Sequence, residues 1–208
     1  MTVTSPEFWD RVAPGYSKQP IADTKSYARK LAATQALMRP NMEVLEFGCG
    51  TGSTALEHAP HVAHIVATDV SAAMIGIGRE KAEHAGINNV SFRQSGVEDF
   101  EAPDGSYDMV LALNLMHLLP DRTAALAKIH RLLKPGVIFI SSTVCVADRM
   151  WLLRPVIPLL QWVGKAPYVS FLGADEVLRE MATAGFEERE HWSHGRTNSL
   201  FVVASTSA

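Results

Sequence analysis

Three glycines follow one short apolar run, and two acidic residues, Glu46 and Asp69, lie at the ends of this run and the next one. Their types and spacing predict a ligand-binding site. Residues 44–52 read VLEFGCGTG, so the run ends in Gly48, Gly50 and Gly52. Glycine has no Cβ, so the backbone there can approach a ligand closely. Asp69 follows Gly48 by 21 residues at the end of a second apolar run, where a carboxylate can accept two hydrogen bonds from a ribose diol. Together these residues predict a site for an adenosine-type cofactor.

Glu46 and Ser53 narrow the type of cofactor. The dinucleotide-binding pattern requires a third glycine at position 53, where this chain has serine. A carboxylate at Glu46 would repel a diphosphate, but it can orient the ammonium of an amino-acid ligand, directly or through water. Both residues argue against an NAD-dependent oxidoreductase, which is the main rival on the same architecture.

Alternating apolar runs and helical patterns would position these residues. Strands are predicted over 44–47, 65–68, 90–93, 107–113 and 137–142, with the continuous apolar character of strands buried on both faces. Helices are predicted over 23–38, 53–59, 71–86, 121–133 and 175–184, and a final strand pair near 187–192 and 200–204. The expected fold is α/β, a three-layer Rossmann-like sandwich with a mostly parallel seven-stranded sheet and a C-terminal antiparallel hairpin.

Length and composition are typical of one compact soluble domain. The chain has 208 residues, of which 47% are hydrophobic, and a formal net charge of −3 without a basic run. Nucleic acid is therefore not an expected partner. The start MTVTSPEFWD has no secretory signal, and Cys49 and Cys145 form no disulfide framework or metal-ligand spacing, so a cytoplasmic protein without a metal site is expected. We predict a single domain over 1–208, with an N-terminal helical cap (about 1–40) and a helical insert (about 148–172).

Five segments resemble, in order and spacing, the motifs of the class I S-adenosylmethionine (SAM) dependent methyltransferases. VLEFGCGTG is similar to the first motif, ATDVS (67–71) to the second, SGVEDF (95–100) to the third, YDMVLALNLMHLL (107–119) to the fourth, and LLKPG (132–136) to the turn before the fifth strand. FWDRVAPGY resembles segments that cover the cofactor in the ubiquinone/menaquinone branch, which would put Tyr16 near the methionine end. The resemblance implies SAM as cofactor and S-adenosyl-L-homocysteine (SAH) as product.

The resemblance also implies roles for the matching residues. Asp69 would hold the ribose hydroxyls and Val70 would lie against the adenine. Many relatives have an acidic residue at the position of Gly96 to bind the adenine amino group, so backbone groups near Val97 and Glu98 are expected to replace it. The residues expected around the cofactor are Tyr16, Glu46, Gly48, Cys49, Gly50, Asp69, Val70, Met74, Val97, Glu98 and Asn114.

Methyl transfer makes a catalytic side chain optional. The leaving group is a neutral thioether that needs no acid, alignment supplies about 7–11 kcal/mol, and a base adds about 10²- to 10⁴-fold. His117 is the candidate base, and the alternative is that it packs in its loop and bonds the backbone. Asn114 would bond the amino-acid end of the cofactor or have a structural role. His191 and His194 are expected to be surface histidines rather than metal ligands.

The segment MWLLRPVIPLLQWVGKAPYVSF is apolar nearly all round and must be covered. A lid over an apolar substrate pocket, an oligomer contact and a helix at a membrane interface are all compatible with it. The predicted function is methyl transfer from SAM to a small, partly apolar molecule by a monomer or homodimer. The alternatives are an NAD-dependent oxidoreductase, a non-catalytic SAM-binding protein and a lipid methyltransferase at the membrane surface. The sequence does not identify the methyl acceptor.

Overall fold

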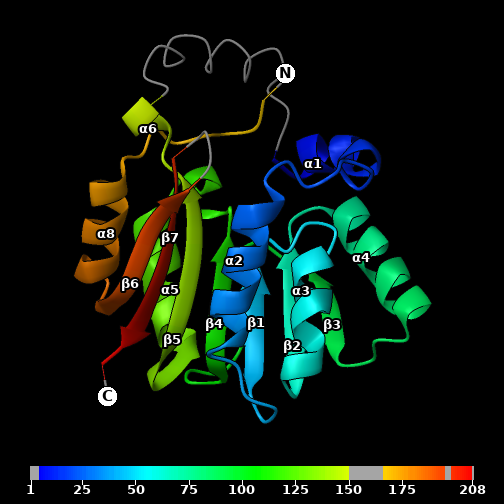
Figure 1. Cartoon of the computed structure of the whole chain (residues 1–208), viewed down its shortest axis with the longest axis horizontal. Coiled ribbons are helices and arrows are strands. Elements are labelled where there is room, and N and C mark those ends of the chain that lie inside the picture. The colour runs from blue at the N-terminus through cyan, green and yellow to red at the C-terminus, as the bar shows by residue number, and fades with distance from the viewer. Residues whose placement is uncertain (1–4, 150–165, 195–197, 208) are drawn as a thin grey trace.

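A seven-stranded sheet forms the centre of the computed structural model, which describes residues 5–149, 166–194 and 198–207 (Figure 1). The strands are β1 (Glu43–Phe47), β2 (His64–Asp69), β3 (Val90–Gln94), β4 (Tyr107–Leu113), β5 (Leu133–Val144), β6 (Phe186–His194) and β7 (Ser199–Thr206). Their order is β3-β2-β1-β4-β5-β7-β6. The pairs from β3 to β5 are parallel, whereas β7 runs antiparallel to both β5 and β6. The predicted fold class, including the C-terminal hairpin, is confirmed.

Helices cover both faces of this sheet (Figure 1). They are α1 (Ser5–Tyr16), α2 (Thr24–Gln35), α3 (Ser53–His58), α4 (Ala72–Ala85), α5 (Arg122–Leu132), α6 (Val146–Arg149) and α8 (Ala174–Thr183), with short 3-10 helices η1 (Ala59–His61) and η2 (Met116–Leu118). Residues of α2, α3 and α4 pack with one set of strand side chains, and residues of α5 and α8 pack with the opposite set. These are the three predicted layers.

Alternation along each strand divides the core in two. In β1, Val44 belongs to the cluster under α3 and α4, whereas Leu45 and Phe47 belong to the cluster under α5. Successive side chains of a strand point to opposite faces, so a sheet covered on both faces needs apolar residues at nearly every position. This is why the strands read as continuous apolar runs, and why the polar exception at Glu46 is informative.

Side-chain caps begin the helices where the sequence predicts them. Asp23 Oδ1 accepts from the backbone N of Ser26, Ser71 Oγ from that of Met74 and Asp121 Oδ1 from that of Ala124, at 2.9–3.0 Å. Each bond satisfies an amide that the first helical turn leaves unpaired. The end of α2 differs from the prediction. It stops at Gln35 rather than residue 38, because the chain changes to turns before Pro40, which disfavours helix in the residue ahead of it.

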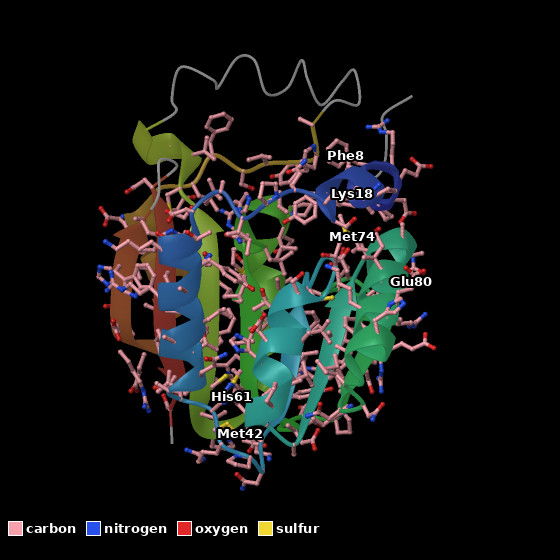
Figure 2. The ribbon with its side chains drawn as sticks, turned by 45° about the vertical axis from the view of Figure 1, so that its right-hand side comes forward. Phe8, Lys18, Met42, His61, Met74 and Glu80 are labelled. Atoms are coloured by element: carbon pink, nitrogen blue, oxygen red, sulfur yellow. The ribbon has the colours of Figure 1, made fainter. Side chains whose placement is uncertain are left out.

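Helix α1 is tied to the start of α4 at one end of the sheet. Asp10 Oδ1 accepts from Ser71 Oγ at 2.6 Å and from the backbone N of Ala73 at 3.0 Å. Figure 2 places Phe8, Lys18 and Met74 at this end, and Met42 and His61 at the opposite end. Since β1 runs from Met42 toward the glycine turn, α1 lies at the carboxyl ends of the parallel strands. The N-terminal segment is therefore positioned over the edge where α/β folds bind ligands.

Two sequence-based expectations concern the apolar insert and the absence of membrane-spanning helices. Most of the predicted insert, residues 150–165, lies outside the described residues, and Trp151 and Trp162 with it. Within the described ranges, no helix combines the length and the apolar character needed to cross a membrane.

We predict that Gly52→Ala destabilises the glycine turn. Gly52 has φ +74°, and a Cβ there would lie 2.5 Å from Phe92 Cε1, which also contacts Gly78. Left-handed strain and overpacking should lower the free energy of unfolding by about 1–3 kcal/mol, measured by urea denaturation. Gly105→Ala is the matched control, because Gly105 has φ +64° but nothing near its Cβ position. Equal losses in the two variants would contradict the close packing of Phe92 against the turn.

Candidate active site

A cavity of about 690 Å³ lies at the carboxyl ends of β1, β2 and β4. Its walls come from α1, the segment after it, α2, the glycine turn, the ends of β2 and β4, the loop 95–99, and Tyr168 and His194. The volume falls in the range of about 300–1,000 Å³ typical of small-molecule sites. Its position is the one where open α/β sheets bind ligands.

All eleven residues expected around the cofactor line this single cavity. They are Tyr16, Glu46, Gly48, Cys49, Gly50, Asp69, Val70, Met74, Val97, Glu98 and Asn114. They come from five separate parts of the chain, so the fold brings residues that are distant in the sequence into one cavity. The candidate base His117 is not among the lining residues.

The glycine turn is held close to β2 and to the loop after β4. The backbone N of Cys49 donates to the carbonyl of Thr68 at 2.9 Å, and the backbone N of Gly50 donates to Asp69 Oδ2 at 2.9 Å. Gly48 has φ +65°, and a Cβ there would lie 2.8 Å from Leu115 Cδ1. Any other residue at position 48 would be strained and would displace Leu115 from the cavity wall.

Asp69 retains acceptor capacity toward the cavity. Its Oδ1 accepts from the backbone N of Ser71 at 2.9 Å, and its Oδ2 accepts from Gly50. Burial raises the pKa of this carboxyl, and the backbone hydrogen bonds oppose the rise. A carboxylate offers about four acceptor positions, so capacity remains for a ligand such as a diol.

Glu46 is buried and lacks a partner for one oxygen. Its side chain is on β1, the residue is 2% exposed, and Oε2 has no hydrogen-bond partner in the described part of the chain. Burial, followed by the negative charge of Asp69, raises the pKa of Glu46 to about 8. An unpaired buried carboxyl costs free energy that a cationic ligand would recover. Glu46 is therefore suited to receive an ammonium group.

The loop 95–99 places an acidic side chain over Gly96. A Cβ built on Gly96 would lie 3.2 Å from the carboxyl carbon of Glu98. The Glu98 carboxyl thus occupies the space that the side chain of a larger residue at position 96 would fill. Val97, in contrast, is buried in the core beneath the loop.

Asn114 combines a structural position with exposure to the cavity. Its backbone is left-handed, with φ +57°, a conformation that asparagine tolerates better than most residues. Its backbone N donates to the carbonyl of Ser142 at 2.7 Å, and its Oδ1 accepts from Ser142 Oγ at 3.2 Å. Both contacts fasten the end of β4 to β5, so the turn toward Leu115 is fixed.

His117 packs in its loop, as the alternative interpretation expected. Its Nδ1 accepts from the backbone N of Val144 at 3.4 Å, and its carbonyl accepts from the backbone N of Ser170 at 2.7 Å. Burial lowers the pKa of His117 to about 4. These contacts join the loop after β4 to the end of β5 and to residue 170.

Several cavity residues were not predicted from the sequence. His191 is exposed, as expected, and its Nδ1 lies 2.6 Å from Glu188 Oε1. His194, also expected at the surface, is partly exposed and lines the cavity. Tyr27 and Lys30 also line it, from one face of α2. Their i, i+3 spacing in the sequence places them on the same face of α2, and this could have predicted that they lie together. No local sequence pattern predicts the position of His194. Among the described residues, no cluster of three or more His, Cys, Asp or Glu side chains could hold a metal ion.

Tyr168 lies on the rim of the cavity at the end of a polar chain. Arg122 binds Glu180 through two hydrogen bonds of 2.6 and 2.8 Å, and its Nη1 donates to Ser170 Oγ at 3.0 Å. Ser170 Oγ in turn donates to the Tyr168 hydroxyl at 3.2 Å. The segment after residue 166 is therefore anchored on α5 and α8.

We predict that Glu46→Gln stabilises the ligand-free protein most at high pH. The folded chain holds the Glu46 proton up to a pKa of about 8, against an ordinary value of 4.5, so the free energy of unfolding falls as the pH rises between these values. Glutamine removes that loss. The difference in melting temperature between variant and wild type should be larger at pH 9 than at pH 5.5. Glu57→Gln, at an exposed position on α3, serves as the control. A pH-independent difference would contradict the raised pKa.

Comparison with known proteins agrees with this geometry. Residues 44–136 match the family described as "Methyltransferase domain". The ubiquinone biosynthesis O-methyltransferase of Acinetobacter baumannii is 28% identical over 71% of this chain and 65% of its own length. The ubiquinone/menaquinone biosynthesis C-methyltransferase of Shewanella frigidimarina is 34% identical over 49% of this chain and 42% of its own length. This chain thus spans less than two thirds of either relative.

The fold comparison extends over more of the chain. A geranyl diphosphate methyltransferase solved in complex with SAM superposes with a TM-score of 0.73, covering 86% of this chain and 84% of its own, at 14% identity. That likeness is one of fold. Together with the matched segment and the order of the strands, it shows an α/β methyltransferase fold. Residues 44–136 thus match a methyltransferase domain, and the chain is distantly similar to the ubiquinone and menaquinone methyltransferases.

Proposed function

We propose that this chain transfers a methyl group from SAM to a small, partly apolar molecule. The observation that carries the proposal is the unpartnered oxygen of buried Glu46 in the same cavity as the partly unsatisfied carboxylate of Asp69. SAM carries an ammonium group at one end and a ribose diol near the other. The two carboxyl groups, separated by the glycine turn, match these two groups in charge and in hydrogen-bonding capacity.

The other cavity residues fit the remaining parts of the cofactor. Val70 and Met74 would provide apolar contacts for the adenine, and the Glu98 carboxyl over Gly96 would accept a hydrogen bond from its amino group. Gly48, Cys49 and Gly50 let the ligand lie along the backbone of the turn, and Asn114 is placed at the amino-acid end.

The N-terminal region would act as the cover of the site. Tyr16 and Trp9 line the cavity, and Asp10 ties α1 to the start of α4. We therefore propose a single domain in which residues of about 1–40 form a cap over the cofactor. The proposed roles of the insert, as lid, oligomer contact or membrane helix, concern residues 150–165, so the lipid-methyltransferase alternative gains no support from the described residues.

Methyl transfer from SAM depends more on alignment of the acceptor with the methyl group than on proton transfer by a side chain. Bound SAM supplies an electrophilic methyl group on a sulfonium that leaves as a neutral thioether. The chain's own part is to hold the acceptor in line and to exclude water, which Leu115, Leu118 and Leu119 can do from the cavity wall. Such positioning is worth about 7–11 kcal/mol. His117 does not line the cavity, so we do not assign it the role of base.

Calorimetric titration with SAM, SAH and NAD tests this function. We expect binding of SAM and SAH and none of NAD, because position 53 lacks the third glycine of the dinucleotide-binding pattern and NAD offers no ammonium to buried Glu46. Acceptor-dependent formation of SAH would then establish methyl transfer. Binding of NAD alone would contradict the proposal, and tight SAM binding without SAH formation from any acceptor would favour the non-catalytic alternative.

The variant Asp69→Asn adds a residue-level control to the same titration. It keeps an acceptor oxygen for one backbone amide but removes the charge. We expect SAM binding to weaken by about 1.5–3 kcal/mol for each charge-assisted hydrogen bond lost. Asp104→Asn, at an exposed site where Asp104 pairs with Arg131, should leave the affinity unchanged. Wild-type affinity in Asp69→Asn would remove the proposed contact to the ribose.

A further inference from the structure

Two basic side chains from distant parts of the chain face the cavity that Glu46 lines. Lys30 comes from α2, and His194 is the last residue of β6. Burial lowers the pKa of His194, and the positive charge of Lys30 is the next largest cause of that shift. The two side chains are therefore close enough to interact electrostatically, and both can act on one ligand.

Lys30 is a partly buried cation without a close partner. Within the described ranges, its ammonium makes no hydrogen bond and no salt bridge. Burial lowers the pKa of Lys30, and the negative charge of Asp23 opposes that shift. The oxygens of Asp23 already accept from the backbone N and the hydroxyl of Ser26, at 2.9 and 2.7 Å. A partly buried ammonium in this position costs free energy that a bound anion would recover.

His194 offers an unpaired polar atom to the same part of the cavity. Its Nε2 is buried and has no hydrogen-bond partner among the residues that the structure describes. Burial and the charge of Lys30 lower the pKa of His194, and the charge of Asp23 opposes them. A neutral imidazole has one N–H, and in the tautomer that carries it at Nε2 this atom can donate to an anion beside Lys30.

Tyr27 lies between this basic pair and Glu46. It lines the cavity from the same face of α2 as Lys30, three residues earlier in the chain. Burial raises the pKa of Tyr27, and the negative charge of Glu46 adds to the rise. Glu46 and Lys30 are thus both near this tyrosine, so an ammonium bound at Glu46 has a basic group beside it on the α2 side of the cavity.

We propose that Lys30 and His194 bind the carboxylate of the cofactor's methionine end, while Glu46 binds its ammonium. This inference rests on the proposed function, because it takes SAM as the ligand. In an α-amino acid the carboxylate and the ammonium are attached to one carbon atom, so the anion nearest to an ammonium at Glu46 is the carboxylate of the same molecule. The Lys30 ammonium pairs with that carboxylate, and His194 Nε2 donates a hydrogen bond to it.

The carboxylate subsite, formed by Lys30 and His194, comes from outside the segments that carry the rest of the cofactor site. Neither residue lies in the five segments at 44–52, 67–71, 95–100, 107–119 and 132–136. One comes from a helix before the first strand, and the other from the strand at the far edge of the sheet. The C-terminal hairpin thereby takes part in cofactor binding, and the cavity selects a ligand that carries both charges of an amino acid.

SAH and decarboxylated SAH test the carboxylate subsite by calorimetric titration at pH 7. Decarboxylated SAH keeps the ammonium and has a hydrogen atom in place of the carboxylate. Wild-type protein should bind SAH about ten-fold or more tightly than decarboxylated SAH. Lys30→Met should abolish this preference and leave the affinity for decarboxylated SAH unchanged, which a merely structural role of Lys30 would not do.

Variants at matched positions serve as controls. Lys25→Met removes an exposed lysine of the same helix that does not line the cavity, and it should keep the preference for SAH. Lys30→Arg should retain the preference in part, because arginine also pairs with carboxylates. His194→Ala should reduce the preference, whereas His191→Ala, at an exposed position of β6 outside the cavity wall, should not.

The outcomes separate this subsite from the proposed function. Equal affinities of wild-type protein for the two ligands, a preference that survives Lys30→Met, or equal weakening of both ligands by Lys30→Met would each overturn the subsite while SAH binding persists. An unchanged preference in His194→Ala would remove His194 from it. Failure of SAH to bind wild-type protein would contradict the proposed function, and this inference with it. Lys30→Gln replaces Lys30→Met if the latter does not fold.

Discussion

The carboxyl groups of Glu46 and Asp69 are both largely buried at the ends of β1 and β2. The electrostatic repulsion between them is the interaction on which the rest of the site depends. Glu46 is next to Ala67 in the register of the parallel pair, two residues before Asp69. The charge of Asp69 and the loss of water both oppose ionisation of Glu46. Such an arrangement weakens the ligand-free protein. It is useful when a ligand brings a positive charge, so the cost in stability and the proposed binding of the cofactor's ammonium have one origin.

The rest of the fold holds that pair in position. The turn between the two acids is fixed by the bond from Gly50 to Asp69, and it lies against Phe92, which packs between Gly52 and Gly78. Asp10 fastens α1 to the start of α4, so the proposed cap and the helix after Asp69 are anchored at one point. Close backbone approach, rather than additional side chains, therefore gives the site its shape.

The predictable parts of this protein are those with local signals. The strand over 107–113 is found at the predicted bounds, and the caps at Asp23, Ser71 and Asp121 follow from short-range hydrogen bonds. The glycine turn and Asp69 were recognisable because each ends an apolar run, which in a parallel sheet puts them at the same edge.

Other features depend on tertiary contacts that no local pattern contains. His194 shares a cavity with Lys30 only because β6 and α2, far apart in the chain, meet at the carboxyl edge of the sheet. His117 shows the complementary difficulty. Its place after β4 was predicted, but the direction of its imidazole is set by the amide of Val144.

The most direct measurement is the number of protons released when SAM binds at pH 7, obtained by calorimetry in buffers that differ in ionisation enthalpy. Glu46, with a pKa of about 8 in the free protein, is mostly protonated there and must ionise to pair with the ammonium. We predict release of about one proton by the wild type and close to none by Glu46→Gln. Binding without proton release, or the same release from Glu46→Gln, would contradict the role of Glu46 as the buried partner of the cofactor.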